Sequence, residues 1–232
     1  MNSQIKALKR NGQAFPVSRL FDGVPDAARE LLLGASQAIA LKNGQVLFQR
    51  GDAGGTMYIV QSGRIEISMM TETGKKVSFN LIGAGQCFGE ISMVDQQPRT
   101  ASALALEPAS LIAVRRAAFF DAIGHCPRLG LNLMEILCER LRWVSDSVEE
   151  YAAYSLQRRI ARRLLVLHKN FAKGDGSIEI AQSDLADFAG ATREATNKIL
   201  IEWKNDGTIG LGRRKIAVMN LAKLDRLACR DE

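Results

Sequence analysis

The sequence predicts an α+β chain with two domains: an antiparallel β-barrel of jelly-roll type, then one long helix, then a small domain of helices with a β-hairpin. Three observations support this prediction. Short apolar runs separated by glycines occupy residues 41–114, an apolar seam at helical spacing begins near residue 127, and capping residues and glycines divide residues 155–232. Short strands at even spacing with glycine-rich turns are typical of sandwiches and barrels.

Length and composition are those of an ordinary globular protein. The chain has 232 residues, of which 47% are hydrophobic and 24% charged, a balance that supports buried cores. No apolar run approaches the ~20 residues that a bilayer span requires, and the first residues, MNSQIKALKRNGQ, lack the apolar segment of a secretory signal. We therefore expect a cytoplasmic protein without a membrane partner, divided into an N-terminal extension (1–17), the barrel (18–126), the long helix (127–154) and a C-terminal domain (155–232).

The cysteines and histidines offer little for metal chemistry. The four cysteines, at positions 87, 126, 138 and 229, form no CxxC pair, and the two histidines, His125 and His168, are not at ligand spacing from another candidate. This distribution predicts no metal site and none of the acid–base pairs of an enzyme. We expect free thiols, with redox sensing through Cys87 as an alternative.

The first domain shows the strand pattern most clearly in TMYIVQSGRIEISMM. Tyr58 and Val60 share one face of a strand before Ser62-Gly63, and Ile65 and Ile67 share one face after it, which predicts a β-hairpin. Glycines mark the corners of the other strands. A helix in this region would contain a glycine in nearly every turn, at a cost of about 1 kcal/mol each.

The long helix carries an apolar seam. Its spacing alternates steps of three and four residues, as in a coiled coil. The simplest partner of this seam is a second copy of the same helix, and we predict a two-fold homodimer through residues 127–152. The charged residues that flank the seam are Glu139, Arg140, Arg142 and Glu149. The seam consists of Met134, Leu137, Leu141, Val144, Val148 and Tyr151.

The pattern of the C-terminal domain predicts a winged helix-turn-helix. A helix is expected from Leu156 to Asn170. Ser183 can cap a short helix that Gly190 ends, and Thr192 can cap a second one with Gly207 just past its end. Two strands around Gly212-Arg213-Arg214 then form a basic wing.

The net charge of +6 is distributed unevenly along the chain. Residues 1–154 hold 16 Lys+Arg against 15 Asp+Glu, a balance of +1, and residues 155–232 hold 15 against 10, a balance of +5. Basic charge on one domain is typical of a surface that binds a polyanion such as DNA. The alternative is an ordinary solvated basic face.

The second short helix has two distinct faces. Ala195, Ile199, Leu200 and Trp203 predict the buried one. A polar cluster near its amino end can read base edges in the major groove, or it can form surface ion pairs of little energetic value. The polar cluster consists of Arg193, Glu194, Asn197 and Lys198.

The most specific motif is FGEISMVDQQPRTAS, residues 88–102, which we call the cassette. Gly89 allows backbone N–H groups to approach a ligand closely. Glu90 can accept a hydrogen bond from a ribose hydroxyl, while Arg99 and Thr100 can donate to a phosphate. The alternative is a turn with a partly exposed Glu90–Arg99 salt bridge. The cassette closely resembles the phosphate-binding cassette of cyclic-nucleotide-binding domains.

From about Ser18 to Ala228 the order of barrel, cassette, seam helix and winged helix-turn-helix resembles the cyclic AMP receptor protein family of bacterial transcription regulators. The resemblance implies allosteric control by a cyclic nucleotide, a palindromic double-stranded DNA target and RNA polymerase as a partner. It implies ligand contacts from Gly89, Glu90, Ile91, Ser92, Arg99, Thr100, Val144 and Ser145. It implies DNA contacts from Gln182, Ser183, Thr192, Arg193, Glu194, Asn197, Lys198 and Arg213.

Two departures from the family pattern concern the ligand. Val144 stands where members selective for cyclic AMP usually have threonine, and Arg99-Thr100-Ala101 is similar to the triplet of cyclic-GMP-responsive domains. We expect cyclic AMP as effector, with cyclic GMP as a second candidate and no metal. One alternative keeps the fold but senses haem or redox state. Another is a regulatory module that binds the nucleotide and acts on a protein partner.

Overall fold

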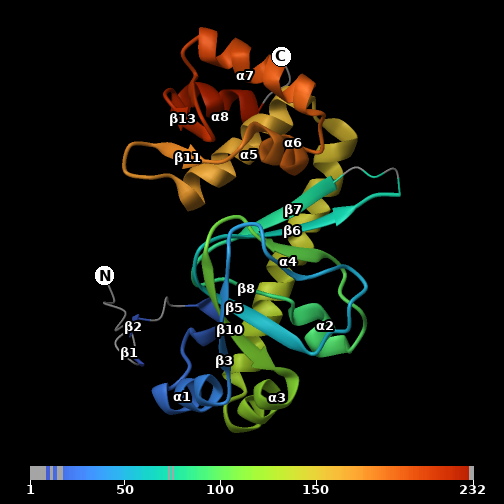
Figure 1. Cartoon of the computed structure of the whole chain (residues 1–232), viewed down its shortest axis with the longest axis vertical. Helices are drawn as coiled ribbons and strands as arrows, with labels where there is room; N and C mark the ends of the chain where they lie inside the picture. The colour runs from blue at the N-terminus through green and yellow to red at the C-terminus, as the bar shows by residue number, and fades with distance from the viewer. Residues whose placement is uncertain (1–8, 11–12, 15–17, 73, 75, 230–232) are drawn as a thin grey trace. The chain divides into compact units, whose positions relative to one another are not determined.

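The computed structural model describes residues 9–10, 13–14, 18–72, 74 and 76–229 (Figure 1). The chain forms two compact units, and the boundary between them divides the long helix α4 (Arg128–Ala153). The first unit holds Met1–Met69 and Asn80–Leu141, and the second holds Met70–Phe79 and Arg142–Glu232. Between residues 18 and 229, no described helix is both long and apolar enough to span a bilayer.

Two four-stranded sheets form the β structure. In spatial order, the first contains β3 (Gln37–Leu41), β10 (Ala109–Arg115), β5 (Thr56–Ser62) and β8 (Cys87–Phe88). The second contains β4 (Val46–Phe48), β9 (Ser102–Ala105), β6 (Ile65–Met70) and β7 (Lys76–Ile82). The predicted antiparallel jelly-roll arrangement is confirmed, with the difference that two sheets share a core instead of closing into one barrel.

Strand β5 is apolar on both faces because each face packs in a different core. Val60 is fully buried in a core with residues of both sheets, such as Ile65 of β6 and Leu111 of β10. Met57 and Ile59, on the opposite face, are buried in a second core with helical residues. These helical elements are η1 (Arg19–Phe21), α1 (Asp26–Gly34), α3 (Arg116–His125) and the start of α4.

The predicted hairpin at Ser62-Gly63 is wrong. Strands β5 and β6 belong to different sheets, so this corner carries the chain from one sheet to the other. Gly63 has φ +85°, and a Cβ atom there would lie 2.6 Å from the carbonyl oxygen of Pro108. Only glycine allows that conformation and that approach. Alternation shows which face of a strand is apolar, but not which strand pairs with it.

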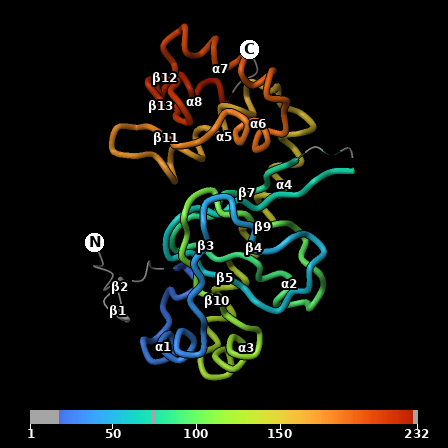
Figure 2. The backbone as a smooth tube through the Cα atoms, in the orientation of Figure 1, coloured from blue at the N-terminus to red at the C-terminus, as the bar shows by residue number. Residues whose placement is uncertain are grey.

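The second unit contains the predicted helix-turn-helix and wing, which can be followed in Figure 2. Its helices are α5 (Leu156–Phe171), α6 (Gln182–Ala189), α7 (Arg193–Asn205) and α8 (Leu221–Cys229). Its three-stranded sheet has the order β11 (Ser177–Glu179), β13 (Lys215–Val218) and β12 (Ile209–Gly212). Helix α5 begins at the predicted residue and ends one residue later than expected.

The helix ends in this unit confirm three predicted signals and correct one. The side chain of Thr192 accepts a hydrogen bond from the Ala195 N–H at 3.2 Å, as a cap does. Gly190 and Gly207 lie just past α6 and α7 with φ +64° and +76°. The predicted cap at Ser183 is wrong, since α6 begins at Gln182 after Ala181 and has no side-chain cap.

The buried face of α7 also differs by one position. Thr196 is fully buried with Ile199, Leu200 and Trp203, whereas Ala195 is only half-buried. Position 196 lies three and four residues before Ile199 and Leu200, so it continues the same apolar stripe. A polar side chain in that stripe was not identified from residue type.

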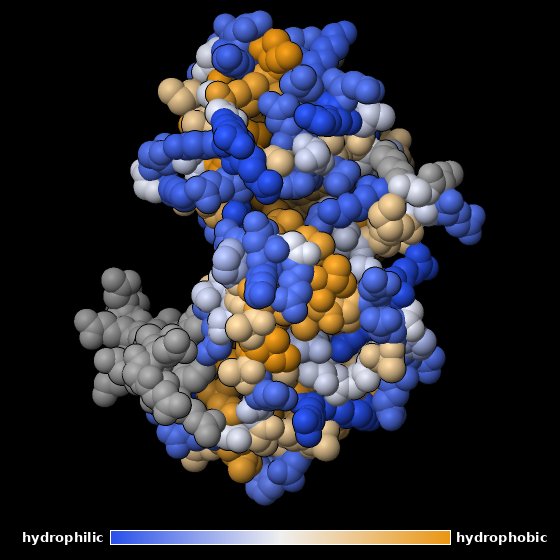
Figure 3. Space-filling view, viewed as in Figure 1, coloured by the Kyte–Doolittle hydropathy of each residue, from blue (hydrophilic) through white to orange (hydrophobic). Residues whose placement is uncertain are grey.

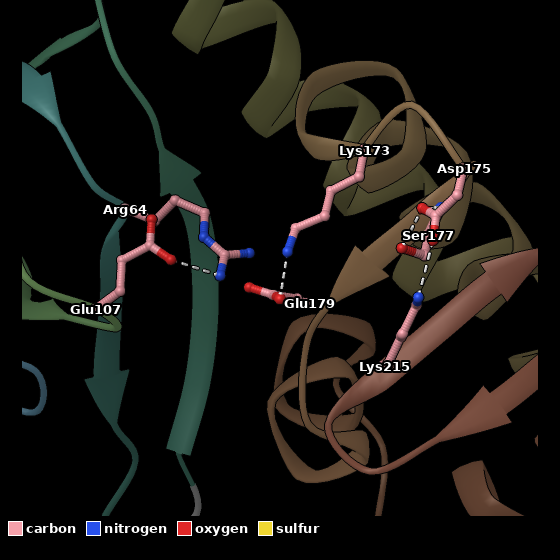
Figure 4. A network of polar contacts seen from close by, with 7 residues as sticks. All are labelled: Arg64, Glu107, Lys173, Asp175, Ser177, Glu179 and Lys215. Carbon is pink, nitrogen blue, oxygen red and sulfur yellow. Dashed lines mark hydrogen bonds and ion pairs between the residues drawn. The ribbon is translucent and has the colours of Figure 1, made fainter.

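Two similar turns stabilise the sheet of this unit. The Asp175 carboxylate accepts from the Ser177 N–H at 3.0 Å and pairs with Lys215 at 2.9 Å (Figure 4). At the other turn, Asp206 accepts from the Thr208 N–H at 2.9 Å, and Lys223 pairs with it. Hydrogen bonds from the Ser177 hydroxyl and Lys215 lower the pKa of the Asp175 carboxyl group below the usual range, and hydrogen bonds from Lys223 and the Thr208 hydroxyl lower that of Asp206.

The N-terminal extension is described only in part. Strand β1 (Lys9–Arg10) pairs antiparallel with β2 (Gln13–Ala14). The remaining residues of the predicted extension, 1–8, 11–12 and 15–17, lie outside the described residues.

Candidate ligand and nucleic-acid sites

The cassette begins where β8 meets the short helix α2 (Glu90–Asp95). Gly89 stands at this junction with φ +78°. A Cβ atom at this position would lie 2.7 Å from Nη1 of Arg99 and 3.3 Å from the carbonyl oxygen of Thr56. Glycine is therefore required both by the backbone conformation and by the space that the arginine occupies.

Arg99 is buried within the cassette, with 5% of the residue exposed. Its Nη1 donates to the Gly89 carbonyl at 2.8 Å and to the Ser92 hydroxyl at 3.0 Å, and its Nη2 donates to the Thr56 carbonyl at 2.8 Å. The guanidinium also lies 4.2 Å from the ring centroid of Phe48. Burial lowers the pKa of Arg99 from its ordinary value, but a guanidinium stays charged in proteins.

Glu90 is fully buried and pairs with Arg140 of α4. Arg140 also donates to the carbonyl oxygen of Cys87 at the start of β8. Sequence reasoning treated Arg140 only as a charge beside the seam, because 50 residues separate it from Glu90. The structure shows that it belongs to the cassette.

Two polar atoms of this network are buried without a hydrogen-bond partner in the described part of the chain. They are Oε2 of Glu90, an acceptor, and Nε of Arg99, a donor. Buried polar groups are nearly always paired, and a buried group left unpaired costs about 1–3 kcal/mol. The cassette thus holds one acceptor and one donor that a polar ligand can satisfy.

The structure brings together four of the predicted ligand residues: Gly89, Glu90, Ser92 and Arg99. Ile91 and Thr100 lie at the surface of the same unit. Val144 and Ser145 lie on α4 within the second unit, and their role at the ligand stays a prediction. The separate Glu90–Arg99 salt bridge considered as an alternative is not formed, since Glu90 pairs with Arg140.

The thiol beside the cassette is poorly suited to redox sensing. Cys87 is 3% exposed, and burial raises the pKa of its thiol to about 12. Because the thiolate is the reactive form, this side chain is unreactive near neutral pH. Across the residues that the structure describes, no three His, Cys, Asp or Glu side chains form a group that could hold a metal ion.

The predicted DNA-binding side chains lie at the start of α7 and in the wing. Arg193, Glu194 and Lys198 are exposed, and Asn197 is half-buried beside them. Arg213 is exposed in the turn between β12 and β13. In Figure 3, hydrophilic side chains cover most of the visible face of α5–α8. At the start of α6, Gln182 is half-buried and Ser183 is exposed.

Comparison with known proteins identifies both units. Residues 38–125 match the family model of the cyclic nucleotide-binding domain, and residues 158–227 match that of the Crp-like helix-turn-helix domain. The cyclic AMP receptor protein of Thermus thermophilus is 30% identical over 212 residues, which cover 91% of this chain and 97% of that protein. The chain belongs to the cyclic AMP receptor protein family.

Other family members extend this likeness. The CRP-like cAMP-activated global transcriptional regulator of Mycobacterium tuberculosis is 27% identical over 214 residues, covering 90% of this chain and 96% of that protein. The crystal structure of the Thermus thermophilus catabolite activator protein is 29% identical and has a TM-score of 0.55, covering 91% of this chain and 99% of that chain. The chain is therefore a transcription regulator of a cyclic-nucleotide-regulated family, with a helix-turn-helix DNA-binding domain.

Proposed function

We propose that this family member is a homodimer that binds a palindromic DNA site when a cyclic nucleotide occupies the cassette. Cyclic AMP is the first effector, and cyclic GMP is the second. The functional domains are residues 18–126 for the ligand, 127–154 for dimerisation and 155–232 for DNA. RNA polymerase is the expected protein partner, and a chromosomal DNA target implies a cytoplasmic site of action.

The pair of unpartnered atoms in the cassette is the observation that carries the ligand proposal. A carboxylate oxygen such as Oε2 of Glu90 accepts a hydrogen bond from a hydroxyl, which a ribose supplies. A guanidinium N–H such as Nε of Arg99 donates to an anionic oxygen, which a cyclic phosphate supplies. A cyclic nucleotide contains both groups at a short fixed separation.

The exposed seam of α4 supports a homodimer. In the single chain, Leu141 is 68% exposed and Val148 65% exposed, although both are large and apolar. Apolar residues repeated at coiled-coil spacing are stabilised by packing against a matching helix. A two-fold dimer would present two copies of α7 to half-sites about 34 Å apart, one turn of DNA.

The proposed tolerance of cyclic GMP depends on two side chains. Thr100 is exposed beside Arg99, where its hydroxyl is available to a guanine amino group. Val144 has no hydrogen-bonding atom and gives no preference for the adenine amino group. We therefore expect a smaller difference in affinity between the two nucleotides than a hydrogen-bonding side chain at position 144 would give.

Calorimetry of the full chain with each nucleotide tests this proposal. We expect one class of site for cyclic AMP, weaker binding of cyclic GMP at the same site, and tighter binding of a palindromic duplex when cyclic AMP is present. A gel shift with random DNA serves as the control for sequence specificity. Failure of both nucleotides to bind would contradict the ligand proposal, and DNA binding that ignores both would contradict the switch.

A further inference from the structure

Four arginines of α5 make contacts within the second unit. Arg158, Arg159, Arg162 and Arg163 follow one another in the sequence RRIARR and contribute to the basic balance of residues 155–232. In the structure, each of them contacts an aromatic ring of the same unit. They therefore connect elements of this unit, in addition to any effect that their charge has on DNA.

The centre of these contacts is Glu150, in the last turns of α4, with 4% of the residue exposed. Nε of Arg162 donates to its Oε1 at 2.7 Å. Nη2 of Arg163 lies 2.8 Å from its Oε2 in an ion pair. Arg163 is itself 4% exposed. Removing one partner of such a buried pair leaves an uncompensated charge, which is strongly destabilising.

Arg163 also reaches the helix-turn-helix. Its Nε donates to the carbonyl oxygen of Phe188 at 3.1 Å, in the last turn of α6. Its guanidinium carbon lies 5.1 Å from the ring centroid of Phe188 and 5.8 Å from that of Trp143 on α4. Because the last carbonyls of a helix lack partners within it, Arg163 joins the end of α6 to α4 with a single side chain.

A second contact between α4 and α6 lies one residue further along. The ring of Tyr151 packs on Gly190, where a Cβ atom would lie 2.4 Å from Cε1 of the tyrosine. Gly190 also ends α6 with φ +64°. Gly190, which separates the two short helices, is thus also the residue against which Tyr151 of α4 packs.

The short link between α4 and α5 is held as well. The guanidinium of Arg158 lies 3.4 Å from the ring centroid of Tyr154, and its Nε donates to the carbonyl oxygen of Ala228 in α8 at 3.2 Å. Ser155 caps α5 by accepting from the Arg158 N–H at 3.3 Å. Bending at this link would break the contact between Tyr154 and Arg158. It would also separate Glu150 and Tyr151 of α4 from α5 and from the end of α6.

We propose that Glu150 and Arg163 are positioning residues that fix the last turns of α4 to the first helix of the helix-turn-helix. A rearrangement of α4 caused by an effector then reaches α7 as a movement of one rigid body and is not absorbed in the link at residues 153–155. The effect on DNA binding rests on the proposed switch by a cyclic nucleotide, whereas the rigidity of the link does not.

Amide hydrogen exchange of the full chain without effector tests the rigidity directly. In Glu150→Gln, we expect exchange in residues 151–158 to be at least ten-fold faster, while exchange in the cassette stays unchanged. Glu202→Gln is the matched control, because Glu202 is exposed on α7 and undergoes the same substitution. Equal exchange in the wild type and in Glu150→Gln would overturn the proposal.

The ratio of DNA dissociation constants without and with cyclic AMP tests the consequence. We expect Glu150→Gln to lower this ratio at least five-fold while the affinity for cyclic AMP stays within two-fold of wild type. A purely structural contact would weaken DNA binding equally in both states, and the unchanged ratio would overturn the proposed role. A wild-type ratio of one would instead contradict the proposed switch, and the exchange experiment would still decide the rigidity.

Arg163→Lys provides a second variant for the case in which Glu150→Gln fails to fold. A lysine keeps the charge beside Glu150, but it lacks the planar fork that reaches Glu150 and the Phe188 carbonyl together. We expect Arg163→Gln to lower the ratio of DNA dissociation constants and to speed up amide exchange in residues 151–158, as Glu150→Gln does. For Arg163→Lys we expect values of both quantities between those of the wild type and Arg163→Gln. Wild-type values of both quantities in Arg163→Gln would overturn the role of Arg163.

Discussion

Each unit buries a glutamate against arginine, but the two networks differ in completeness. Glu150 has an arginine beside each of its oxygens, with Arg162 donating to Oε1 and Arg163 in an ion pair 2.8 Å from Oε2. Glu90 pairs with Arg140 through Oε1. In the described residues neither Oε2 atom accepts a hydrogen bond, but that of Glu150 has an arginine at ion-pair distance. The two buried glutamates are therefore compensated differently: two arginines hold Glu150 between helices, whereas we propose that a ligand completes the pairing of Glu90.

The largest expected effect is that of Arg99→Ala on the cassette. Hydrogen bonds to charged groups contribute about 1.5–3 kcal/mol each, and 1.4 kcal/mol is a tenfold change, so losing the Nε–H donor alone should weaken cyclic AMP binding at least ~10-fold. Arg99→Ala also removes the hydrogen bonds to the carbonyl groups of Gly89 and Thr56, so we expect a total loss of ~100-fold or more. Calorimetry measures this loss, and circular dichroism checks the fold. Arg115→Ala, at an exposed position of β10, is the control. Unchanged affinity in Arg99→Ala would show that the cassette does not bind the phosphate.

The same substitution, Glu to Gln, in both networks tests whether the two buried glutamates differ in function. Glu90→Gln removes the charge that pairs with Arg140 and weakens the acceptor offered to the ligand, so cyclic AMP affinity should fall roughly 10–100-fold, or about 1.5–3 kcal/mol. Glu150→Gln should leave that affinity within two-fold. Calorimetry on the two variants separates the networks, and equal losses would mean that they are not functionally distinct.

A smaller effect is expected for Arg193→Ala, which lies outside both networks at the exposed start of α7. The loss of a bidentate contact to a base should cost about 1–3 kcal/mol at a palindromic site. Binding to random DNA should change far less. Fluorescence anisotropy with both duplexes measures the difference, and equal losses on the two would identify Arg193 as a phosphate contact.

The smallest effect concerns an exposed pair in the second unit. Hydrogen bonds from Lys223 and Thr208 lower the pKa of the Asp206 carboxyl group, so its stabilising effect is present above the usual pKa of about 3.9 and is lost as the pH falls through the lowered value. Wild type should therefore lose more stability between about pH 5 and pH 3 than Asp206→Asn does. Thermal unfolding across this range measures the difference, and parallel curves would contradict it.

Local signals made much of the second unit predictable. Thr192, Gly190 and Gly207 mark helix ends because each acts within one turn of its own position, and the structure confirms all three. The cassette was recognisable for a similar reason, since its glycine, carboxylate and arginine lie within one short segment. The predicted roles of Val144 and Ser145, which lie on α4 outside this segment, remain predictions.

Contacts between distant residues could not be read from the sequence. Strands β5 and β6 have the alternation of a hairpin, yet they belong to different sheets, because alternation carries no information about the partner strand. Arg140 has its carboxylate partner Glu90 50 residues away, and Arg163 donates to the Phe188 carbonyl 25 residues away. Residue type does not show whether an arginine on a helix faces solvent or a buried acceptor, so only the fold identifies these two.

The burial of Cys87 has a practical consequence for labelling. Of the four thiols, Cys87 and Cys126 are buried, whereas Cys138 and Cys229 are exposed. A maleimide dye should therefore attach to the unaltered chain at two known positions and leave the cassette intact. Cys138 follows Leu137 of the apolar seam on α4, so in the proposed homodimer its rate of alkylation should fall as the protein concentration rises through the dissociation constant of the dimer. The native chain thus carries a thiol with which the proposed self-association can be tested.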